Sequence, residues 1–165
     1  DDLANAIRFK LSGFDLQEME LAYAPPFSSA KDPVNMAGYV IGNVMEGLMK
    51  PFYLEDLESI PEDAVRLDVR TVEEYAGGTI PGFINIPLDS LRERMDELDL
   101  TKDIYITCQI GLRGYLAQRI LDQAGARTWN LSGGYRFYEM KAKDEQSMAA
   151  AMTMCTECGM EVNAK

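Results

Sequence analysis

The feature of the chain best suited to chemistry is a cysteine at the end of a strand-like run. An apolar run at residues 104–107 leads directly into Cys108, and an amphipathic helical pattern follows it, with Leu116, Ala117, Ile120, Leu121 and Ala124 on one face. We therefore expect Cys108 at a strand-to-helix turn. Backbone N–H groups and the positive end of a helix dipole stabilise an anionic sulfur there, and the thiolate is the nucleophilic form of cysteine.

Arg113 is the second candidate, because it places a cation five positions after Cys108. A cation in the first turn of a helix opposes the helix dipole, so its position suggests that an anion binds nearby. A buried cysteine is usually a small apolar residue, and an arginine is usually a surface charge. The Gly-rich loop and the fixed offset of the arginine favour a functional interpretation of both residues.

The absence of histidine restricts the mechanism of any such nucleophile. None of the 165 residues is histidine. Cys-His and Ser-His-Asp schemes require an imidazole base and are therefore excluded. Cys108 must be activated by its surroundings alone.

Composition limits the partners and the location of the protein. The formal net charge of −11 argues against nucleic acid and against an anionic membrane surface, since both need clustered Lys and Arg. No apolar run is long enough to cross a membrane, and the first residues do not form a signal peptide. These features predict a cytoplasmic protein. The chain has no initiator Met and starts within a helix-like pattern, so we expect it to be a fragment of a longer protein.

Strand-like and helix-like segments alternate from residue 63 onward, which predicts a parallel α/β sheet covered by helices on both faces. We expect strands at 65–69, 83–86, 104–107 and 127–131, and helices at 71–76, 88–98 and 113–124. Reactive groups of such sheets gather at the carboxyl ends of the strands. Asp68 and Arg70 should therefore emerge at the same edge as Cys108, where a structural ion-pair role, shared with Glu74, is the favoured interpretation.

The first fifty residues carry a different pattern. Asp32 followed by Pro33 is a typical helix start, and the helix should end at Pro51. Its apolar stripe comprises Ala37, Val40, Ile41, Val44, Met45 and Leu48. The local chain offers little to cover this stripe, so a partner subunit or a missing domain is expected there. Residues 51–62 have the character of a linker with one short helical turn.

Four segments in order resemble the rhodanese sulfurtransferase domain: residues 68–75, 80–87, 108–113 and 131–135. The resemblance covers residues 52–142 and implies that Cys108 carries a persulfide. Arg113 would help to bind an anionic sulfur donor such as a persulfide, polysulfide or thiosulfate, with coenzyme A among the thiol acceptors. The loop that would cradle the extra sulfur comprises Gln109, Ile110, Gly111, Leu112 and Gly114.

Residues 21–39 resemble the end of the dimerisation domain of flavin-dependent pyridine nucleotide-disulfide oxidoreductases of the coenzyme A-disulfide reductase group. The implied fold is thus the tail of a dimerisation domain in residues 1–50, followed by the rhodanese domain. The resemblance implies a homodimeric parent with reductase domains, FAD, NAD(P)H and coenzyme A. Tyr23 would approach the active site of its partner subunit. No cofactor is expected in this chain itself, which lacks a GxGxxG fingerprint.

Residues 143–165 are expected to form a tail or linker toward a possible further domain. They contain one CxxC pair, Cys155 and Cys158. A structural zinc site needs four ligands, which one pair without histidine does not provide, so metal or redox use of the pair is the minority interpretation.

Two alternatives to sulfur transfer follow from the same residues. A Cys-loop-Arg phosphatase can share this fold, but only four residues separate Cys108 from Arg113, a loop that suits one extra sulfur better than a whole phosphate. The rhodanese fold could also serve as a catalytically idle docking or dimerisation module.

Overall fold

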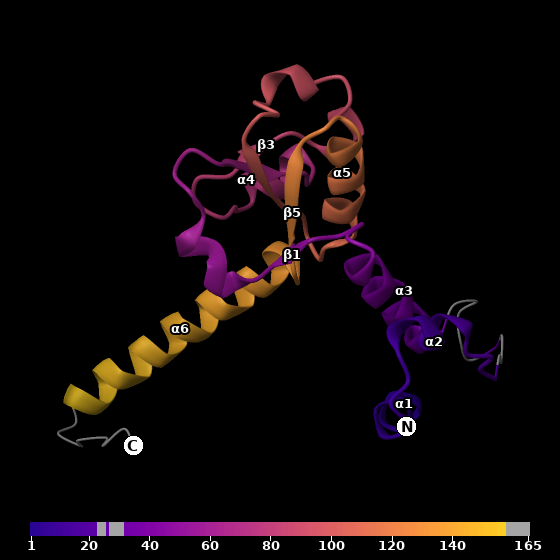
Figure 1. The fold of residues 1–165 in the computed structure, drawn as a ribbon. Coiled ribbons are helices and arrows are strands. Elements are labelled where there is room, and N and C mark those ends of the chain that lie inside the picture. Colours follow the sequence, from indigo (N-terminus) through magenta and orange to yellow (C-terminus); the bar gives the residue numbers. More distant parts are fainter. Residues whose placement is uncertain (23–25, 27–31, 158–165) are drawn as a thin grey trace. The chain divides into compact units, whose positions relative to one another are not determined.

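The computed structural model describes residues 1–22, 26 and 32–157, with side chains described as far as residue 149. The chain divides into two compact units, residues 1–50 and residues 51–165. Figure 1 shows the helices and strands of both units.

The first unit is helical, with α1 at Asp2–Phe9, α2 at Gly13–Glu18 and α3 at Pro33–Met45. The predicted start of α3 is confirmed, because the Asp32 side chain accepts a hydrogen bond from the Val34 N–H at 2.8 Å and Pro33 occupies the first turn. The helix ends earlier than predicted. Gly47 adopts a left-handed conformation with φ of 72° just past its end, which terminates the helix before Pro51 is reached.

Helix α3 packs on α2 mainly at glycines, and of its apolar stripe Ile41 lies against Gly13 of α2. Gly38 and Gly42 are buried, and a Cβ at Gly38 would overlap the backbone of α2 at Leu16 and Gln17. Without side chains at these two positions, the helices approach closely. The predicted stripe is instead largely exposed, including Val40, Ile41, Val44 and Met45.

The second unit is built on a five-stranded sheet in the order β1-β5-β4-β2-β3, in which every neighbouring pair is parallel (Figure 1). The strands are β1 at Pro51–Phe52, β2 at Val65–Asp68, β3 at Ile84–Asn85, β4 at Asp103–Thr107 and β5 at Arg127–Leu131. The predicted parallel α/β sheet is therefore confirmed.

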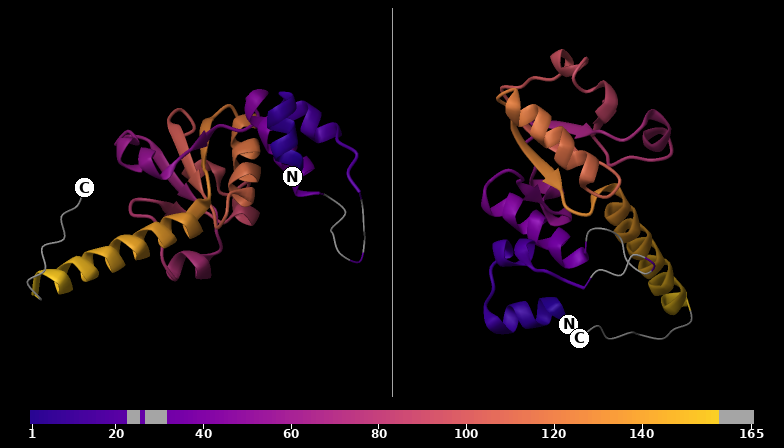
Figure 2. Two further views of the ribbon diagram at one scale, coloured as in Figure 1. Left: turned by 90° about the horizontal axis from the view of Figure 1, so that it is seen from below. Right: turned by 90° about the vertical axis from the view of Figure 1, so that its right-hand side faces the viewer.

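Both faces of the sheet are covered, as Figure 2 also shows. On one face, α5 at Leu112–Gln123 and the short turns η2 at Leu88–Ser90 and η3 at Met95–Glu97 pack on Leu67, Ile104 and Ile106. On the other face, η1 at Leu54–Ser59 and the start of α6 at Gly134–Glu157 cover an aromatic cluster. Alternate residues of β4 point to opposite faces, so Cys108 joins the side of Ile104 and Ile106 and faces α5.

Two segments differ from their predicted form. Residues 51–52 are not linker but an edge strand paired with β5, and two residues are too few to show a strand period. Residues 88–98 form two 3₁₀ turns rather than one helix, since apolar residues three apart also share a face of a 3₁₀ turn. Residues 143–157 are helical and belong to α6, and their expected role as a tail or linker stays a prediction. The short helix α4 at Val72–Ala76 forms as predicted, with the Thr71 hydroxyl as its cap.

Candidate active site

Cys108 follows the last residue of β4 and is buried, with a relative exposure of 1%. Its Sγ accepts a hydrogen bond from the backbone N–H of Gly111 at an N···S distance of 3.1 Å. Helix α5 begins one residue later, at Leu112. The sulfur therefore lies inside a tight turn that closes onto the positive end of a twelve-residue helix, an arrangement that favours negative charge on the sulfur.

The loop after Cys108 is fastened to the first turn of α6. The N–H groups of Tyr135 and Arg136 donate to the carbonyls of Cys108 (2.8 Å) and Gln109 (3.1 Å). Across a trans peptide the next N–H points opposite to the carbonyl, so the N–H groups of Gln109 and Ile110 are directed away from α6. The carbonyls of Cys108 and Gln109 therefore point toward α6, and the N–H side of the loop is free to contact a ligand.

Arg113 lies in the first turn of α5 and is held by Glu74 of α4. Its two terminal nitrogens donate to the two carboxylate oxygens of Glu74, both at 2.7 Å. This bidentate bond lowers the pKa of Glu74 to about 2 and raises that of Arg113. Glu74 had been expected to join Asp68 and Arg70. The structure pairs it with Arg113 instead, because the guanidinium of Arg70 is already bonded to Asp68 and to the Gly78 carbonyl.

Asp68 and Arg70 form a buried ion pair at the same sheet edge, with a shortest N···O distance of 2.7 Å. Arg70 also donates to the carbonyl of Gly78 at 2.7 Å, and its guanidinium stacks 3.9 Å from the centre of the Tyr135 ring. Its remaining nitrogen approaches the side-chain oxygen of Gln109 at 3.5 Å. The pair is thus buried, and it contacts the loop through Gln109 rather than facing solvent.

The remaining loop residues differ in exposure. Ile110 and Leu112 are 60% and 65% exposed and form an apolar rim, whereas Gly114 is buried against Asn130. Sequence reasoning missed Asn130, whose side chain bonds the loop at the Gly111 carbonyl, and Tyr135, which stacks on Arg70. An asparagine inside an otherwise strand-favouring segment was a signal that could have indicated the first of these.

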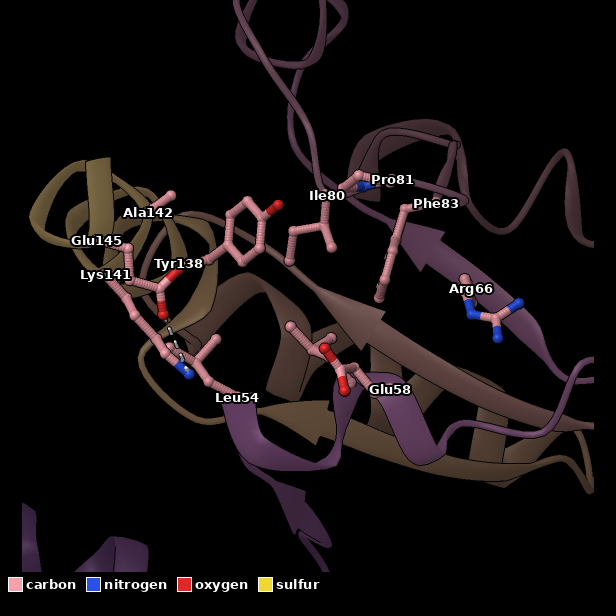
Figure 3. A pocket seen from close by; sticks show the side chains of 11 residues that line it. Leu54, Glu58, Arg66, Ile80, Pro81, Phe83, Tyr138, Lys141, Ala142 and Glu145 are labelled. Carbon is pink, nitrogen blue, oxygen red and sulfur yellow. Dashed lines mark ion pairs between the residues drawn. The ribbon is translucent and has the colours of Figure 1, made fainter. Parts of the chain in front are cut away.

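One hollow of the second unit lies away from this loop. It has a volume of about 410 Å³ and is enclosed by α6, η1 and the turn at 80–83, with an apolar floor at Leu54, Ile80 and Phe83 (Figure 3). Lys141 and Glu145, 4.0 Å apart, lie at its edge. Because neither Cys108 nor any residue of its loop lines this hollow, it takes no part in the chemistry of the thiol.

Other predicted site residues lie outside the described part of the structure. Tyr23 and Cys158 are outside the described residues, and Cys155 falls in α6 beyond the last described side chain. Within the described residues, no group of three or more Cys, Asp or Glu side chains is arranged to hold a metal ion. No helix in the described part is both long and apolar enough to cross a membrane.

Comparison with known proteins identifies the family. The model of the rhodanese-like domain matches residues 54–141, which contain the sheet from β2 onward, Cys108 and its loop. The chain belongs to the rhodanese-like domain family. A sulfurtransferase of Allochromatium vinosum is 39% identical over 74 residues, covering 44% of this chain and 69% of that protein. The uncharacterised protein YqhL of Bacillus subtilis is 33% identical over 109 residues, covering 66% of this chain and 84% of that protein.

Two solved structures resemble a larger part of the rhodanese-like chain. The reduced CoADR-RHD of Bacillus anthracis is 47% identical with a TM-score of 0.79, and an NAD-dependent persulfide reductase from A. fulgidus is 39% identical with a TM-score of 0.71. Each match covers 84% of this chain, more than residues 51–165 alone, so the likeness extends into residues 1–50. The chain spans about a quarter of the length of either protein, 25% in both cases.

Proposed function

We propose that this chain carries a sulfurtransferase domain in which Cys108 relays sulfane sulfur as a persulfide, within a larger NAD(P)H-dependent reductase of coenzyme A-disulfides, persulfides or polysulfides. The observation that carries the proposal is the Cys108 Sγ at the end of β4, bonded by the Gly111 N–H at the start of α5. The sulfurtransferase of A. vinosum and the persulfide reductase of A. fulgidus support the same chemistry.

In the first step the Cys108 thiolate attacks the outer sulfur of a persulfide, polysulfide or thiosulfate. A bond forms between Sγ and that sulfur while the S–S bond of the donor breaks. The electron pair of that bond leaves with the rest of the donor, as a thiolate, a shorter polysulfide or sulfite. Cys108 then carries a persulfide whose terminal sulfur is negative, and the inward N–H groups of the loop stabilise this charge.

In the second step an acceptor thiolate attacks the terminal sulfur of the Cys108 persulfide. The Sγ–S bond breaks, the acceptor becomes a persulfide, and the Cys108 thiolate is regenerated. The two steps together need no net oxidant or reductant. Coenzyme A, or a cysteine of a reductase domain of the proposed parent protein, has the chemistry that this acceptor requires.

FAD and NAD(P)H belong to other parts of the proposed parent protein. The turn between β4 and α5 is where a parallel sheet would bind a dinucleotide phosphate. Here the Gly111 N–H already donates to the Cys108 sulfur, and the Asn130 side chain fills the space beside Gly114. This turn therefore does not fit a dinucleotide. The formation of the persulfide is accordingly assigned to Cys108 and its loop.

The test is the intact mass of the chain after incubation with a polysulfide or a thiol persulfide. The wild-type chain is expected to gain about 32 Da, one sulfur atom, and to lose it on addition of coenzyme A. The Cys108→Ala variant is expected to gain no sulfur at that position and to release no sulfide or thiocyanate. If the wild-type chain gains no mass, the domain is an idle docking or dimerisation module.

A further inference from the structure

We infer that Asn130 is a positioning residue for sulfur transfer: by holding the Gly111 carbonyl it restricts rotation at Gly111, so that the Gly111 N–H, which belongs to the preceding peptide, stays directed at the Cys108 sulfur. The inference deepens the proposed function and rests on it. Asn130 belongs to β5, in register with Ile106 of the strand that leads to Cys108. Its side chain therefore rises on the same face of the sheet as Cys108.

Asn130 holds the carbonyl end of Gly111. Its side-chain nitrogen donates to the Gly111 carbonyl at 3.0 Å, and its relative exposure is 4%. The same carbonyl accepts the N–H of Tyr115 at 2.9 Å, a hydrogen bond of the first turn of α5. Asn130 thus ties the beginning of α5 to the end of β5.

Gly111 is the part of the loop that most needs such a tie. Its φ of 116° lies in the region that favours glycine, and glycine resists rotation about its backbone bonds least of all residues. Rotation at Gly111 would turn its N–H away from Sγ. With the carbonyl held by Asn130 and by α5, the N–H can keep its 3.1 Å contact with the sulfur.

The side-chain oxygen of Asn130 also has a fixed position, and burying it there lowers the stability of the fold. The Asn130 side-chain oxygen is buried without a hydrogen-bond partner among the described residues. It lies where a Cβ on residue 114 would be, so only glycine at Gly114 leaves room for it. A buried oxygen without a partner lowers stability. Asn130 is therefore poorly explained by folding alone, and the contact with Gly111 gives it a role.

This cost makes the inference testable with Asn130→Leu, which keeps the branched shape and the number of side-chain heavy atoms but removes both polar atoms. We expect this variant to unfold at the same urea concentration as the wild type or a higher one. At neutral pH, iodoacetamide should alkylate Cys108 about fivefold more slowly, the effect of about one hydrogen bond. At high pH the alkylation rates of the variant and of the wild type should converge. Sulfur uptake from a thiol persulfide at neutral pH should slow by the same factor.

Thr128→Val is the matched control. Thr128 is buried on the same strand and bonds Asp122 through its hydroxyl, so the variant also loses one side-chain hydrogen bond of β5. It should leave the alkylation profile unchanged. An Asn130→Leu variant with the wild-type profile, or a Thr128→Val variant slowed equally, would overturn the inference.

A pair of variants tests the Gly114 contact separately. Gly114→Ala should slow alkylation in the wild-type background by displacing the Asn130 side chain, and should have little further effect in an Asn130→Ala background. Equal effects in both backgrounds would contradict the role of Asn130. A wild-type chain that takes up no sulfur but still shows these alkylation differences would overturn the proposed function while leaving the positioning role in place.

Discussion

The cation beside the reactive sulfur is already paired within the chain. Arg113, which the sequence places near Cys108 as a possible anion-binding group, donates both terminal nitrogens to Glu74. An anionic donor that enters the loop must therefore share the Arg113 guanidinium with Glu74 or displace the Glu74 carboxylate from it. The ion pair joins the first turns of α4 and α5, so it also contributes to the stability of the loop.

Replacing Glu74 by Gln should lower stability in a pH-dependent manner. The pKa of Glu74 falls from an ordinary 4.5 to about 2. A fully buried pair with this shift would contribute about 3 kcal/mol. Since about a third of each side chain is exposed, we expect about 1 kcal/mol. This contribution is complete at pH values above 4.5 and is lost as the pH falls toward 2.

Urea unfolding of the wild type and Glu74→Gln at neutral pH and at about pH 3 measures this contribution. The difference between them should shrink by more than half at the lower pH. Glu93→Gln, which changes an exposed carboxylate between η2 and η3, serves as the control and should show no such trend. A Glu74→Gln deficit that is equal at both pH values would contradict the ion-pair explanation.

At the scale of elements, the sequence predicted what is local and missed what joins separate segments. The strand before Cys108, the helix after it and β5 were predictable, because each is a continuous apolar or periodic run. The two-residue strand β1 was not predictable, because its identity depends on pairing with β5. The same holds for the site. Cys108 and its loop are contiguous, whereas Glu74 and Asn130 reach the loop from other elements.

The junction between the loop and α6 gives a prediction about one glycine. Gly134 has a φ of 60°, and a Cβ there would overlap the Cys108 carbonyl and the adjacent backbone. Gly125, past the end of α5, has a φ of 89° but open space around it. We expect Gly125→Ala to cost about 1 kcal/mol through backbone strain alone, and Gly134→Ala to cost about 2–4 kcal/mol.

Urea unfolding measures the stability lost in each of the two variants. Sulfur uptake shows whether the Gly134→Ala substitution also disturbs the loop of Cys108. Gly134→Ala should also slow persulfide formation on Cys108, because the clash pushes on the peptide that carries the sulfur. Gly125→Ala should leave uptake unchanged. Equal destabilisation by the two substitutions would show that α6 does not press on the loop.

At the scale of the whole molecule, the two units differ in how completely they bury their apolar residues. The second unit has two internal clusters that cover both faces of its sheet. The first unit leaves large apolar side chains exposed on α1 and α3, among them Ile7 at 80%, Phe9 at 69% and Met45 at 57%. Exposed apolar groups at this density are typical of an interaction surface.

We therefore expect residues 1–165 to self-associate through residues 1–50, as the resemblance to a dimerisation domain also implies. In sedimentation velocity, the chain should behave as a dimer or larger species, and residues 51–165 alone as a monomer. Val40→Glu combined with Val44→Glu changes two exposed positions one turn apart on α3 and should shift the full chain to the monomer. Ser147→Glu, on an exposed part of α6, adds charge elsewhere and should not. A full chain that sediments as a monomer would instead assign the apolar face of α3 to the reductase domains of the parent protein.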